Sequence, residues 1–386
     1  MQNILYIADA NPALKNGHGK MISMHHSIIK EIFQDHLYTI YGFGENEYHE
    51  GKTWQIPNND KKGKMVSVLR RRPAYLSSAA EKKIFSIIKE EKIECVYFDN
   101  SISGVIIKKI KKMYPNIGVV VYFPDIEKAL MGQQIQAAKL YRKISLRIMI
   151  QNELITSRYA DHCIVLNNRD AELFTRYYGK KPDSIIPIVV PMPQLSEICA
   201  SHHSDTILNL LFVGIDYKPN VDGIEWLIKE VLPKLKVHFT LKIVGYHMEQ
   251  YKETWEELNP NVSVIGTVDA VLPYYENADV VIAPISEGGG MKVKTAEAFS
   301  YGKKFIGLPE SLEGYWEQMP DSLRERDVFR VRSAEQFACA IQSLYDSDFY
   351  KRSAELINWT KNTFSYESIR DSYKKAFFEL GSLTIE

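Results

Sequence analysis

Residues 278–302 read ADVVIAPISEGGGMKVKTAEAFSYG and combine three local patterns. The first seven residues form an apolar run that is typical of a buried β-strand. Further on, Ala296, Ala298 and Phe299 make the apolar side of a helix. The glycines between the two patterns allow the backbone to approach a ligand closely. A strand, a glycine turn and a helix in this order predict one repeat of an α/β fold.

The charged residues of the same stretch indicate an anion site. A helix N-terminus offers free N–H groups and the positive end of a dipole, which suits a diphosphate. Lys292 and Lys294 add two cations, and Glu297 follows Lys294 on nearly the same helix face. Such an arrangement suits a nucleotide sugar, with lysine on phosphate and glutamate on ribose hydroxyls. The alternative is a plain connection carrying a surface Lys–Glu pair worth roughly 0.2–0.5 kcal/mol.

Length and composition describe an ordinary globular protein. The 386 residues correspond to about two or three domains, and 45% hydrophobic with 25% charged residues is typical of such chains. No apolar run approaches the roughly 20 residues that span a bilayer. The N-terminus reads as a β-strand without a signal pattern, so we expect a cytoplasmic protein. The four cysteines are scattered, which argues against a zinc site or a disulfide framework.

Strand and helix patterns alternate along both halves of the chain, which predicts parallel sheets. In the first half we expect strands over 3–8, 37–42, 95–99, 118–123 and 163–166, and helices over 20–33, 79–91, 105–113, 135–159 and 170–178. In the second half we expect strands over 208–213, 239–244, 262–265, 279–283 and 305–308, and helices over 221–235, 271–276, 334–344, 349–360 and 366–380.

A proline-rich and then polar segment, 191–206, interrupts this alternation and predicts a linker. The expected organisation is therefore an N-terminal domain over 1–190 and a C-terminal domain over 207–365. We expect the last segment, 366–386, to pack back on the first domain.

Charge is unevenly distributed although the net charge is zero. Residues 1–190 hold 28 Lys and Arg against 19 Asp and Glu, whereas residues 191–386 hold 20 against 29. The basic residues cluster over 70–72, over 108–112, and at 142, 143 and 147. They suit an anionic membrane surface, and solvated helix faces are the alternative. No nucleic-acid-binding motif accompanies them.

A second candidate ligand position follows the strand over 208–213. Gly214 ends this strand and leaves room for a ligand at the sheet edge. Lys218, four residues later, is within reach of a phosphate; the alternative is a solvated loop residue.

These segments resemble a known enzyme family. FVGIDYKPNVDGIEWLIKEVLP, LKIVG, VSVIGTVDAVLPYYENADVVIAPISEGGGMKVKTAEAFSYGKKFIG and LEGY follow one another through residues 208–315 as in family 4 glycosyltransferases. Residues 289–298 fit the pattern Gly-Gly-x-(Arg/Lys)-x-Lys-x-x-Glu-Ala of that family. The resemblance implies a GT-B fold, in which two Rossmann-like domains with parallel sheets face each other across a cleft.

The resemblance also implies roles for individual residues. Glu297 would bind the donor ribose, and Lys294, with Lys292 and Lys218, would bind the diphosphate. Glu287 would lie near the donor sugar, although it precedes Glu297 by ten residues and many relatives have eight. The catalytic candidates are Lys294, Lys292 and Glu287, and the remaining donor-site candidates of this half are Gly214, Gly288, Gly289, Gly290 and Met291.

The first half resembles the family more weakly. Gly17 and Gly19 match a glycine-rich loop that faces the donor, and a plain turn is the alternative. The segment VYFPDIE aligns with a His-Asn-x-Glu or His-Asp-x-Glu motif but lacks its histidine. Asp125 and Glu127 would line the acceptor side, or else cap the following helix.

The implied activity is retaining transfer of a sugar from a nucleotide-diphosphate sugar to a glycan or lipid-linked acceptor, in bacterial surface polysaccharide synthesis. The resemblance implies no metal and no other cofactor, and a location in the cytoplasm or at the inner face of the membrane. The alternatives are a sugar-nucleotide epimerase of the same fold and a non-catalytic protein that binds sugar nucleotides.

Overall fold

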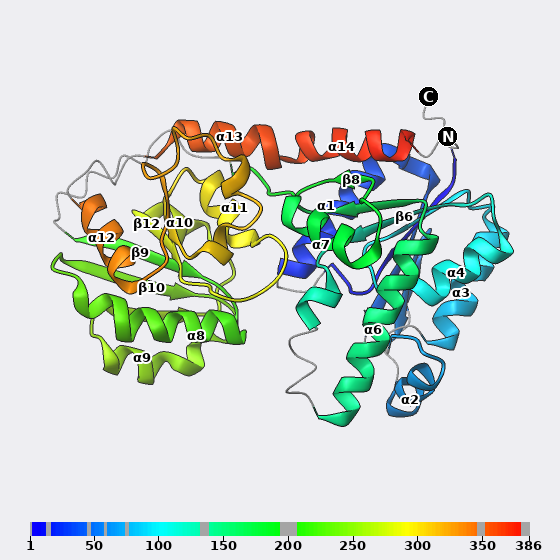
Figure 1. Ribbon diagram of the computed structural model, residues 1–386, viewed down its shortest axis with the longest axis horizontal. Coiled ribbons are helices and arrows are strands. Elements are labelled where there is room, and N and C mark those ends of the chain that lie inside the picture. Colours follow the sequence, from blue (N-terminus) through cyan, green and yellow to red (C-terminus); the bar gives the residue numbers. More distant parts are fainter. Residues whose placement is uncertain are drawn as a thin grey trace. The chain divides into compact units, whose positions relative to one another are not determined.

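The computed structural model describes residues 2–12, 17–44, 48–57, 60–73, 77–131, 139–193, 207–345 and 352–379. The chain divides into two compact units. The first comprises Met1–Val189 with Ile369–Glu386, and the second comprises Val190–Ser368. Each unit is a sheet with helices, as the ribbon in Figure 1 shows. Most of the predicted linker, 194–206, lies outside the described residues.

The first unit is built on an eight-stranded sheet in the order β3-β4-β2-β1-β5-β6-β7-β8. All neighbouring strands are parallel except β3 and β4. The order reverses at β1, which lies between β2 and β5, so this edge of the sheet has a switch point there. The strands are β1 (Ile4–Ala8), β2 (Leu37–Gly44), β3 (Tyr48–Glu50), β4 (Thr53–Pro57), β5 (Cys95–Phe98), β6 (Gly118–Phe123), β7 (His162–Val165) and β8 (Ser184–Ile185).

The central strands of this sheet are buried along their whole length, since helices cover both faces of a parallel sheet. The helices are α1 (Gly17–Phe33), α2 (Lys61–Leu69), α3 (Ser78–Glu90), α4 (Gly104–Met113), α6 (Leu140–Tyr159) and α7 (Asn168–Tyr178). Local sequence sets the ends of α7. The Asn167 side chain accepts a hydrogen bond from the Asp170 N–H, and Gly179 ends the helix at a φ of 73°.

The last helix, α14 (Tyr366–Phe378), packs into the first unit from Ile369 onward. The Tyr373 hydroxyl lies 3.0 Å from that of Tyr97 on β5. The Phe377 ring meets the Phe33 ring edge to face, with centroids 5.0 Å apart. The end of the chain therefore completes the core of the unit that its beginning forms.

The second unit is built on a six-stranded, fully parallel sheet in the order β11-β10-β9-β12-β13-β14. Its strands are β9 (Leu208–Val213), β10 (Phe239–Val244), β11 (Val262–Gly266), β12 (Val280–Ala283), β13 (Lys304–Gly307) and β14 (Val328–Arg330). The order reverses at β9, between β10 and β12. Open α/β sheets bind ligands at such a point, beyond the carboxyl ends of the strands.

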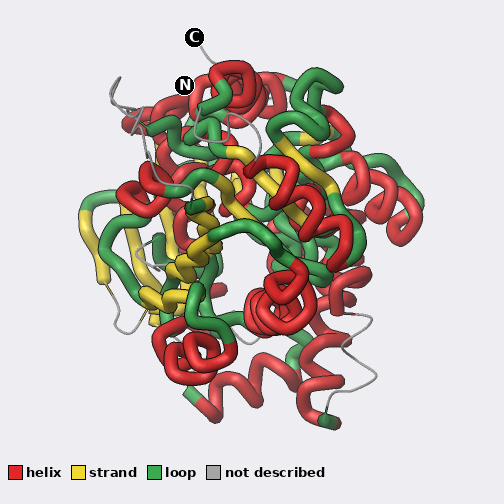
Figure 2. The backbone as a smooth tube through the Cα atoms, turned by 90° about the vertical axis from the view of Figure 1, so that its left-hand side faces the viewer, coloured by secondary structure: helices red, strands yellow, loops and turns green. Residues whose placement is uncertain are grey.

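Short helices connect these strands, and Figure 2 shows the helices of the molecule in red around the yellow strands. They are α8 (Lys218–Trp226), α9 (Lys252–Leu258), α10 (Leu272–Asn277), α11 (Val293–Ser300), α12 (Ala334–Tyr345) and α13 (Ala354–Phe364). Helix α8 packs tightly against the end of β12, because a Cβ on Gly223 would lie 2.2 Å from the Pro284 carbonyl oxygen.

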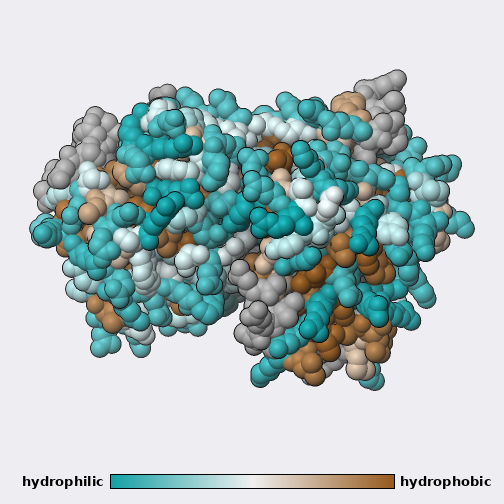
Figure 3. All heavy atoms as spheres, viewed as in Figure 1, coloured by the Kyte–Doolittle hydropathy of each residue, from teal (hydrophilic) through white to brown (hydrophobic). Residues whose placement is uncertain are grey.

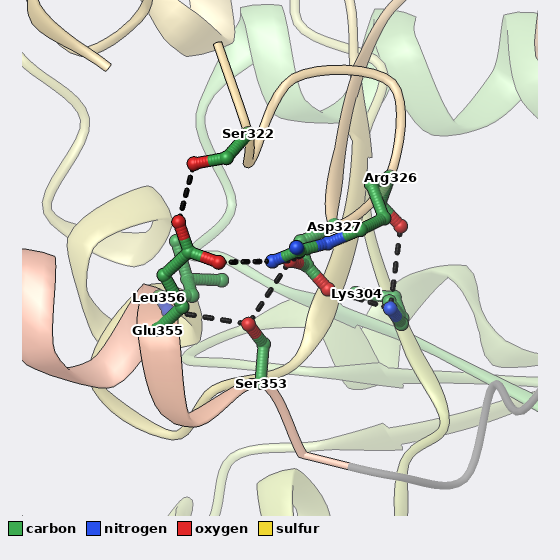
Figure 4. Close-up of polar contacts among 7 residues, drawn as sticks. All are labelled: Lys304, Ser322, Arg326, Asp327, Ser353, Glu355 and Leu356. Carbon is green, nitrogen blue, oxygen red and sulfur yellow. Dashed lines mark hydrogen bonds and ion pairs between the residues drawn. The ribbon is translucent and has the colours of Figure 1, made fainter. Parts of the chain in front are cut away.

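A buried carboxylate ties the β13–β14 edge of the second sheet to α13 (Figure 4). Asp327 is 1% exposed and pairs with Lys304 at 2.5 Å and with Arg326. The Ser353 hydroxyl donates to Asp327 at 3.0 Å and also accepts from the Leu356 N–H as the N-cap of α13. Arg326 reaches Glu355 in the first turn of α13. The Asp327 carboxylate thus connects β13, the loop before β14 and the N-terminus of α13.

Both sheets are parallel or nearly so, as the sequence predicts. Among the helices that the structure describes, none is both long and apolar enough to cross a bilayer.

Candidate functional site

Two glycines shape the carboxyl edge of the second sheet at its switch point. Gly214 follows β9 and Gly245 follows β10 with a φ of 152°. A Cβ on Gly245 would lie 1.8 Å from the Gly214 carbonyl oxygen. A Cβ on Gly214 would lie 2.7 Å from the Lys294 ammonium nitrogen. The space that the sequence predicts beside Gly214 is therefore the space in which the Lys294 ammonium lies.

Lys294 stands in the first turn of α11 and points back toward the end of β9. Its Nζ donates to the Asn220 side-chain oxygen at 2.7 Å and lies 4.5 Å from the centroid of the Phe212 ring. Burial, together with the nearby Lys292 charge, lowers the Lys294 pKa to about 7, although the Glu297 charge opposes both effects. Among the described residues Lys294 forms no ion pair with a carboxylate, so it remains able to pair with an anion.

Asn220 fixes this arrangement from the opposite side of the switch point. It lies in the first turn of α8, where its side-chain amide donates to the Ile215 carbonyl at 2.8 Å. The side-chain oxygen of Asn220 accepts a hydrogen bond from the Lys294 ammonium. The sequence indicates only a helix-entry turn at this position, because the contact joins residues 74 positions apart.

Lys292 has a different place from Lys294. Its ammonium pairs with Glu310 at 2.7 Å and donates to the carbonyl oxygens of Gly289 at 2.9 Å and Gly290 at 3.3 Å. The Lys292 carbonyl accepts from the Tyr315 hydroxyl at 2.9 Å. Lys292 thus stabilises the conformation of the glycine turn. Its charge also lowers the pKa of Lys294.

Glu297 lies on the same face of α11 as Lys294, as the spacing predicts. It is 8% exposed, and the Tyr275 hydroxyl of α10 lies 3.5 Å from its Oε2. The Tyr275 ring stacks on the Tyr301 ring with centroids 4.5 Å apart. A carboxylate and an ammonium therefore lie about one helical turn apart on α11, with the ammonium beside the end of β9.

The glycine turn itself adopts backbone conformations that favour glycine. Gly288 has a φ of 141° and Gly290 a φ of 58°. Gly288 and Gly289 are half-buried, Met291 is buried, and Glu287 is exposed.

Lys218 lies apart from this group. It is the first residue of α8 and forms an exposed i,i+4 ion pair with Asp222. That hydrogen-bonded pair raises the Lys218 pKa, and Glu287 adds to the effect through its charge. Lys218 and Glu287 therefore interact electrostatically, while Lys294 takes the position beside Gly214.

In the first unit, the predicted glycine loop falls at the start of α1. Gly17 and Gly19 are in the first helical turn, and the preceding residues 13–16 lie outside the described ones. Between the glycines, the His18 ring contacts Asp9, just after β1, at 3.0 Å. This hydrogen bond raises the His18 pKa, with Asp99 and Asp125 contributing through their charges. These carboxylates follow β1, β5 and β6, three strands that are neighbours in the sheet.

Asp125 and Glu127 follow β6, but the helix beginning there is capped from elsewhere. Glu153 of α6 accepts from the N–H groups of Glu127 at 2.9 Å and Lys128 at 3.0 Å. Burial, together with the Glu153 carboxylate, raises the pKa of Glu127 to about 8. Sequence reasoning missed Glu153, because nothing local marks a mid-helix glutamate as the cap of another helix.

Further polar groups lie beneath this edge of the first sheet. Asp99 accepts from the Tyr6 hydroxyl at 2.5 Å and contacts the His25 ring at 2.8 Å. Its position directly after β5 is the signal that marks it, as for Asp9 after β1. Among the described residues, no group of three or more His, Cys, Asp or Glu side chains is arranged to hold a metal ion.

Two parallel α/β sheets, with glycines, a lysine and a glutamate at the switch point of the second, define the class of protein: a GT-B-type α/β protein. Residues 208–347 match the family model described as glycosyl transferases group 1. The match lies within the second unit and agrees with the resemblance found in the sequence. No curated protein sequence matches the chain.

Solved structures show the same fold over the whole chain. Sucrose-phosphate synthase from Thermosynechococcus elongatus is similar with a TM-score of 0.75 and 14% identity, covering 100% of both chains. The lipopolysaccharide outer core galactosyltransferase WaaB matches with a TM-score of 0.66 and 16% identity over 98% of this chain and 99% of its own. HepE of Anabaena, solved with UDP-glucose, matches with a TM-score of 0.67 and 13% identity over 98% and 100%. At these identities the likeness establishes the GT-B fold.

Proposed function

We propose that the protein is a retaining glycosyltransferase that uses a nucleotide-diphosphate sugar as donor. The observation that carries the proposal is the Lys294 ammonium at the end of β9. It is held by Asn220 and Phe212 but not neutralised by a carboxylate of the described chain. The family model over residues 208–347 and the complexes of HepE with UDP and UDP-glucose support this choice of donor.

In the proposed reaction, the bond between the sugar C1 and the β-phosphate oxygen breaks, and C1 bonds to an acceptor hydroxyl oxygen on the same face. The hydroxyl proton passes to the departing phosphate, which leaves as a nucleoside diphosphate. Negative charge grows on that phosphate as the bond breaks. Lys294 and the N–H groups at the start of α11 stabilise it without reorganisation.

The remaining residues have positioning roles in this proposal. Glu297, buried beside Tyr275, accepts hydrogen bonds from the ribose hydroxyls. Lys292 binds Glu310 and two glycine carbonyls, so its role is to keep the turn in shape beneath the diphosphate. Glu287 and Lys218 are exposed and lie near the donor sugar. No metal is required, since the cation and the helix N-terminus supply the positive charge.

For the acceptor, we propose a glycan or lipid-linked saccharide of bacterial surface polysaccharide synthesis, handled by the first unit. The carboxylates after β1 and β6, with Glu127 among them, are suited to accept hydrogen bonds from sugar hydroxyls. The pKa of Glu127 of about 8 keeps this carboxyl largely protonated at neutral pH, so that it also donates.

The experiment is a donor screen followed by kinetics of matched variants. Sugar nucleotides of uracil, guanine and other bases are tested by thermal shift, and the best is used for turnover. Lys294→Ala should lower kcat by roughly 100-fold, the scale of one lost charge-stabilising group. Glu297→Ala should mainly raise the donor KM. Lys229→Ala and Glu225→Ala, a surface pair on the same unit, are the controls.

The outcomes separate the alternatives. Unchanged donor kinetics in both site variants would overturn the assignment. Conversion of the donor without any acceptor would identify an epimerase instead. Calorimetric binding of a donor with no turnover on any acceptor would identify a binding protein.

A further inference from the structure

Large apolar side chains are exposed together on two helices of the first unit. On α2 these are Met65, Val66 and Leu69, which are 58%, 39% and 76% exposed. On the first turns of α6 they are Leu140 and Ile144, 76% and 41% exposed. In Figure 3 a brown area lies at the lower right, where Figure 1 places α2 and α6. We call these five side chains the α2–α6 ridge.

The two helices form one surface because they are joined. The Asn152 side chain of α6 donates to the Arg71 carbonyl at the end of α2 at 3.0 Å. Its side-chain oxygen also accepts from the Val105 N–H of α4, so α6 is fixed to the body of the unit. The next residue, Arg72, is buried and pairs with Glu81 of α3. These contacts therefore hold the helices of the ridge in fixed positions on the first unit.

The ridge is bordered mainly by basic residues, and the acidic residues of its helices are the exposed N-cap Asp60 of α2 and the buried Glu153 of α6. Neither 61–71 nor 139–152 contains an aspartate or a glutamate. The exposed basic residues of these segments are Lys62, Lys64, Arg70, Arg71, Lys139, Arg142 and Arg147. Two of the three basic clusters found in the sequence thus meet beside apolar side chains, a combination that binds anionic bilayer surfaces.

The third basic cluster, on α4, differs from the other two in its charge and in its exposed apolar side chains. On α4, Lys109 pairs with Glu81 and Lys111 pairs with Asp161, which neutralises part of its charge. Met113 is the one strongly exposed apolar residue of that helix. Met113 of α4 is thus a control for an isolated exposed apolar side chain.

We propose that the α2–α6 ridge is a docking surface for an anionic lipid bilayer. The apolar side chains enter the boundary between headgroups and acyl chains, and the surrounding lysines and arginines contact lipid phosphates. A second copy of the chain is a poorer occupant, because two such surfaces would bring like charges together. The proposal goes beyond sugar transfer, since docking requires no turnover, and it would bring the enzyme to a lipid-linked acceptor.

The test is cosedimentation of the full-length protein with vesicles. Vesicles of phosphatidylcholine with phosphatidylglycerol are compared with pure phosphatidylcholine, at low and high salt. Wild type should bind the anionic vesicles, less at high salt, and the neutral ones weakly. Leu69→Glu and Leu140→Glu should each lower the partition coefficient at least about tenfold, since each places a charge where an apolar side chain would insert.

Matched controls carry the same changes on other surfaces. Met113→Glu should bind like wild type, and so should a double variant of two exposed lysines on α3, Lys82→Gln with Lys89→Gln. Lys62→Gln with Arg142→Gln, which removes charges beside the ridge, should bind more weakly. Unchanged melting temperatures show that the variants fold, and unchanged donor binding separates this result from failure of the transferase assignment.

Three results would overturn the proposal. They are absence of binding to anionic vesicles, equal loss in Met113→Glu and in the ridge variants, and a dimer in ultracentrifugation that Leu69→Glu dissociates.

Discussion

Lys294 occupies a position where burial and the proposed ligand favour opposite protonation states. Its surroundings lower the pKa to about 7, which favours the neutral amine in the empty site. A diphosphate beside it would favour the ammonium. The Phe212 ring and the Asn220 oxygen stabilise the cation without neutralising it, so its charge remains available to the ligand.

This environment predicts a pH dependence of donor use. The Lys294 pKa is lowered, so the ammonium is populated below about pH 7 and is lost as the pH rises through that value. Because kcat/KM reports the pKa values of the free enzyme, kcat/KM for the donor should decline above about pH 7. Lys294→Arg, whose side chain stays charged, should shift the decline to higher pH. If kcat/KM of Lys294→Arg declines at the same pH as that of wild type, the decline belongs to another titrating group.

Gly214 is predicted to matter for the position of this ammonium. Gly214→Ala would place a Cβ 2.7 Å from the Lys294 nitrogen and 2.8 Å from the Phe212 ring. The lysine end can shift, so the fold should persist while donor affinity falls by roughly tenfold, the effect of losing about 1.4 kcal/mol. Calorimetry with the donor measures this, and Gly179→Ala, at a glycine with no atom near its Cβ position, controls for general strain. Equal affinity in Gly214→Ala and wild type would contradict the account.

At the scale of residues, the sequence predicts which side chains share one helix face. It does not predict contacts between residues that are far apart in the chain. Lys294 and Glu297 share a face because the spacing of a helix dictates it. The partners of the two lysines are not predictable in this way. Asn220 reaches Lys294 across the switch point, and Glu310 reaches Lys292 from beyond β13.

Elements with strong apolar runs lie where their patterns predict them. The strands β6, β9 and β10 coincide with the expected ranges, since buried parallel strands read as continuous apolar segments. The sequence did not predict the short strands β3, β4 and β14, because three to five residues carry little periodicity. It did not predict helix α2 either, because α2 exposes its apolar side chains. The helix expected over 349–360 is observed over Ala354–Phe364, starting at the Ser353 cap.

The Asp327 network predicts a strong effect on stability at the scale of elements. Asp327→Asn removes the partner of Lys304, whose side chain is 13% exposed, and weakens the link to α13. Loss of one member of a buried pair should lower the free energy of unfolding by about 3 kcal/mol. Urea denaturation measures this, with the exposed Asp321→Asn as control. Equal stability of the two variants would contradict the role given to Asp327.

The same network predicts acid sensitivity. Burial alone would raise the Asp327 pKa, but hydrogen bonds from Lys304 and Arg326 outweigh it and lower the pKa below its usual value. A lowered carboxyl pKa contributes stability that is present above about pH 3.9 and is lost as the pH falls through the folded-state value. Wild type should therefore lose stability below about pH 3.9 more steeply than Asp327→Asn. Parallel acid unfolding curves would contradict this.

At the scale of the molecule, the chain begins and ends in the same unit. Phe377 of α14 is fully buried against the first unit, whereas the next residue, Phe378, is 48% exposed. Phe377→Ala should lower the free energy of unfolding by about 3–5 kcal/mol, as is usual for a buried aromatic side chain. Phe378→Ala should change it little. Thermal unfolding that treats the two variants alike would show that α14 does not complete this core.

The likeness to GT-B structures at 12–16% identity shows a common fold although most of the residues differ. In this chain, the strand order and the glycine turns at the sheet edge set the geometry of the switch point. The sequence therefore predicts the fold class, and it marks the glycine turn and α11 as a candidate donor site. The acceptor side is less predictable, since its carboxylates come from separate strands and its cap, Glu153, comes from a distant helix.

The central claim is that Lys294 binds the diphosphate of a nucleotide-sugar donor. The most direct measurement is isothermal titration of wild type and Lys294→Gln with the nucleoside diphosphate of the preferred donor, at pH 6. We predict micromolar-range binding by wild type and a loss of at least about tenfold in the variant, corresponding to about 1.4 kcal/mol. Equal affinity in the two proteins, or no nucleotide binding by wild type, would contradict the account.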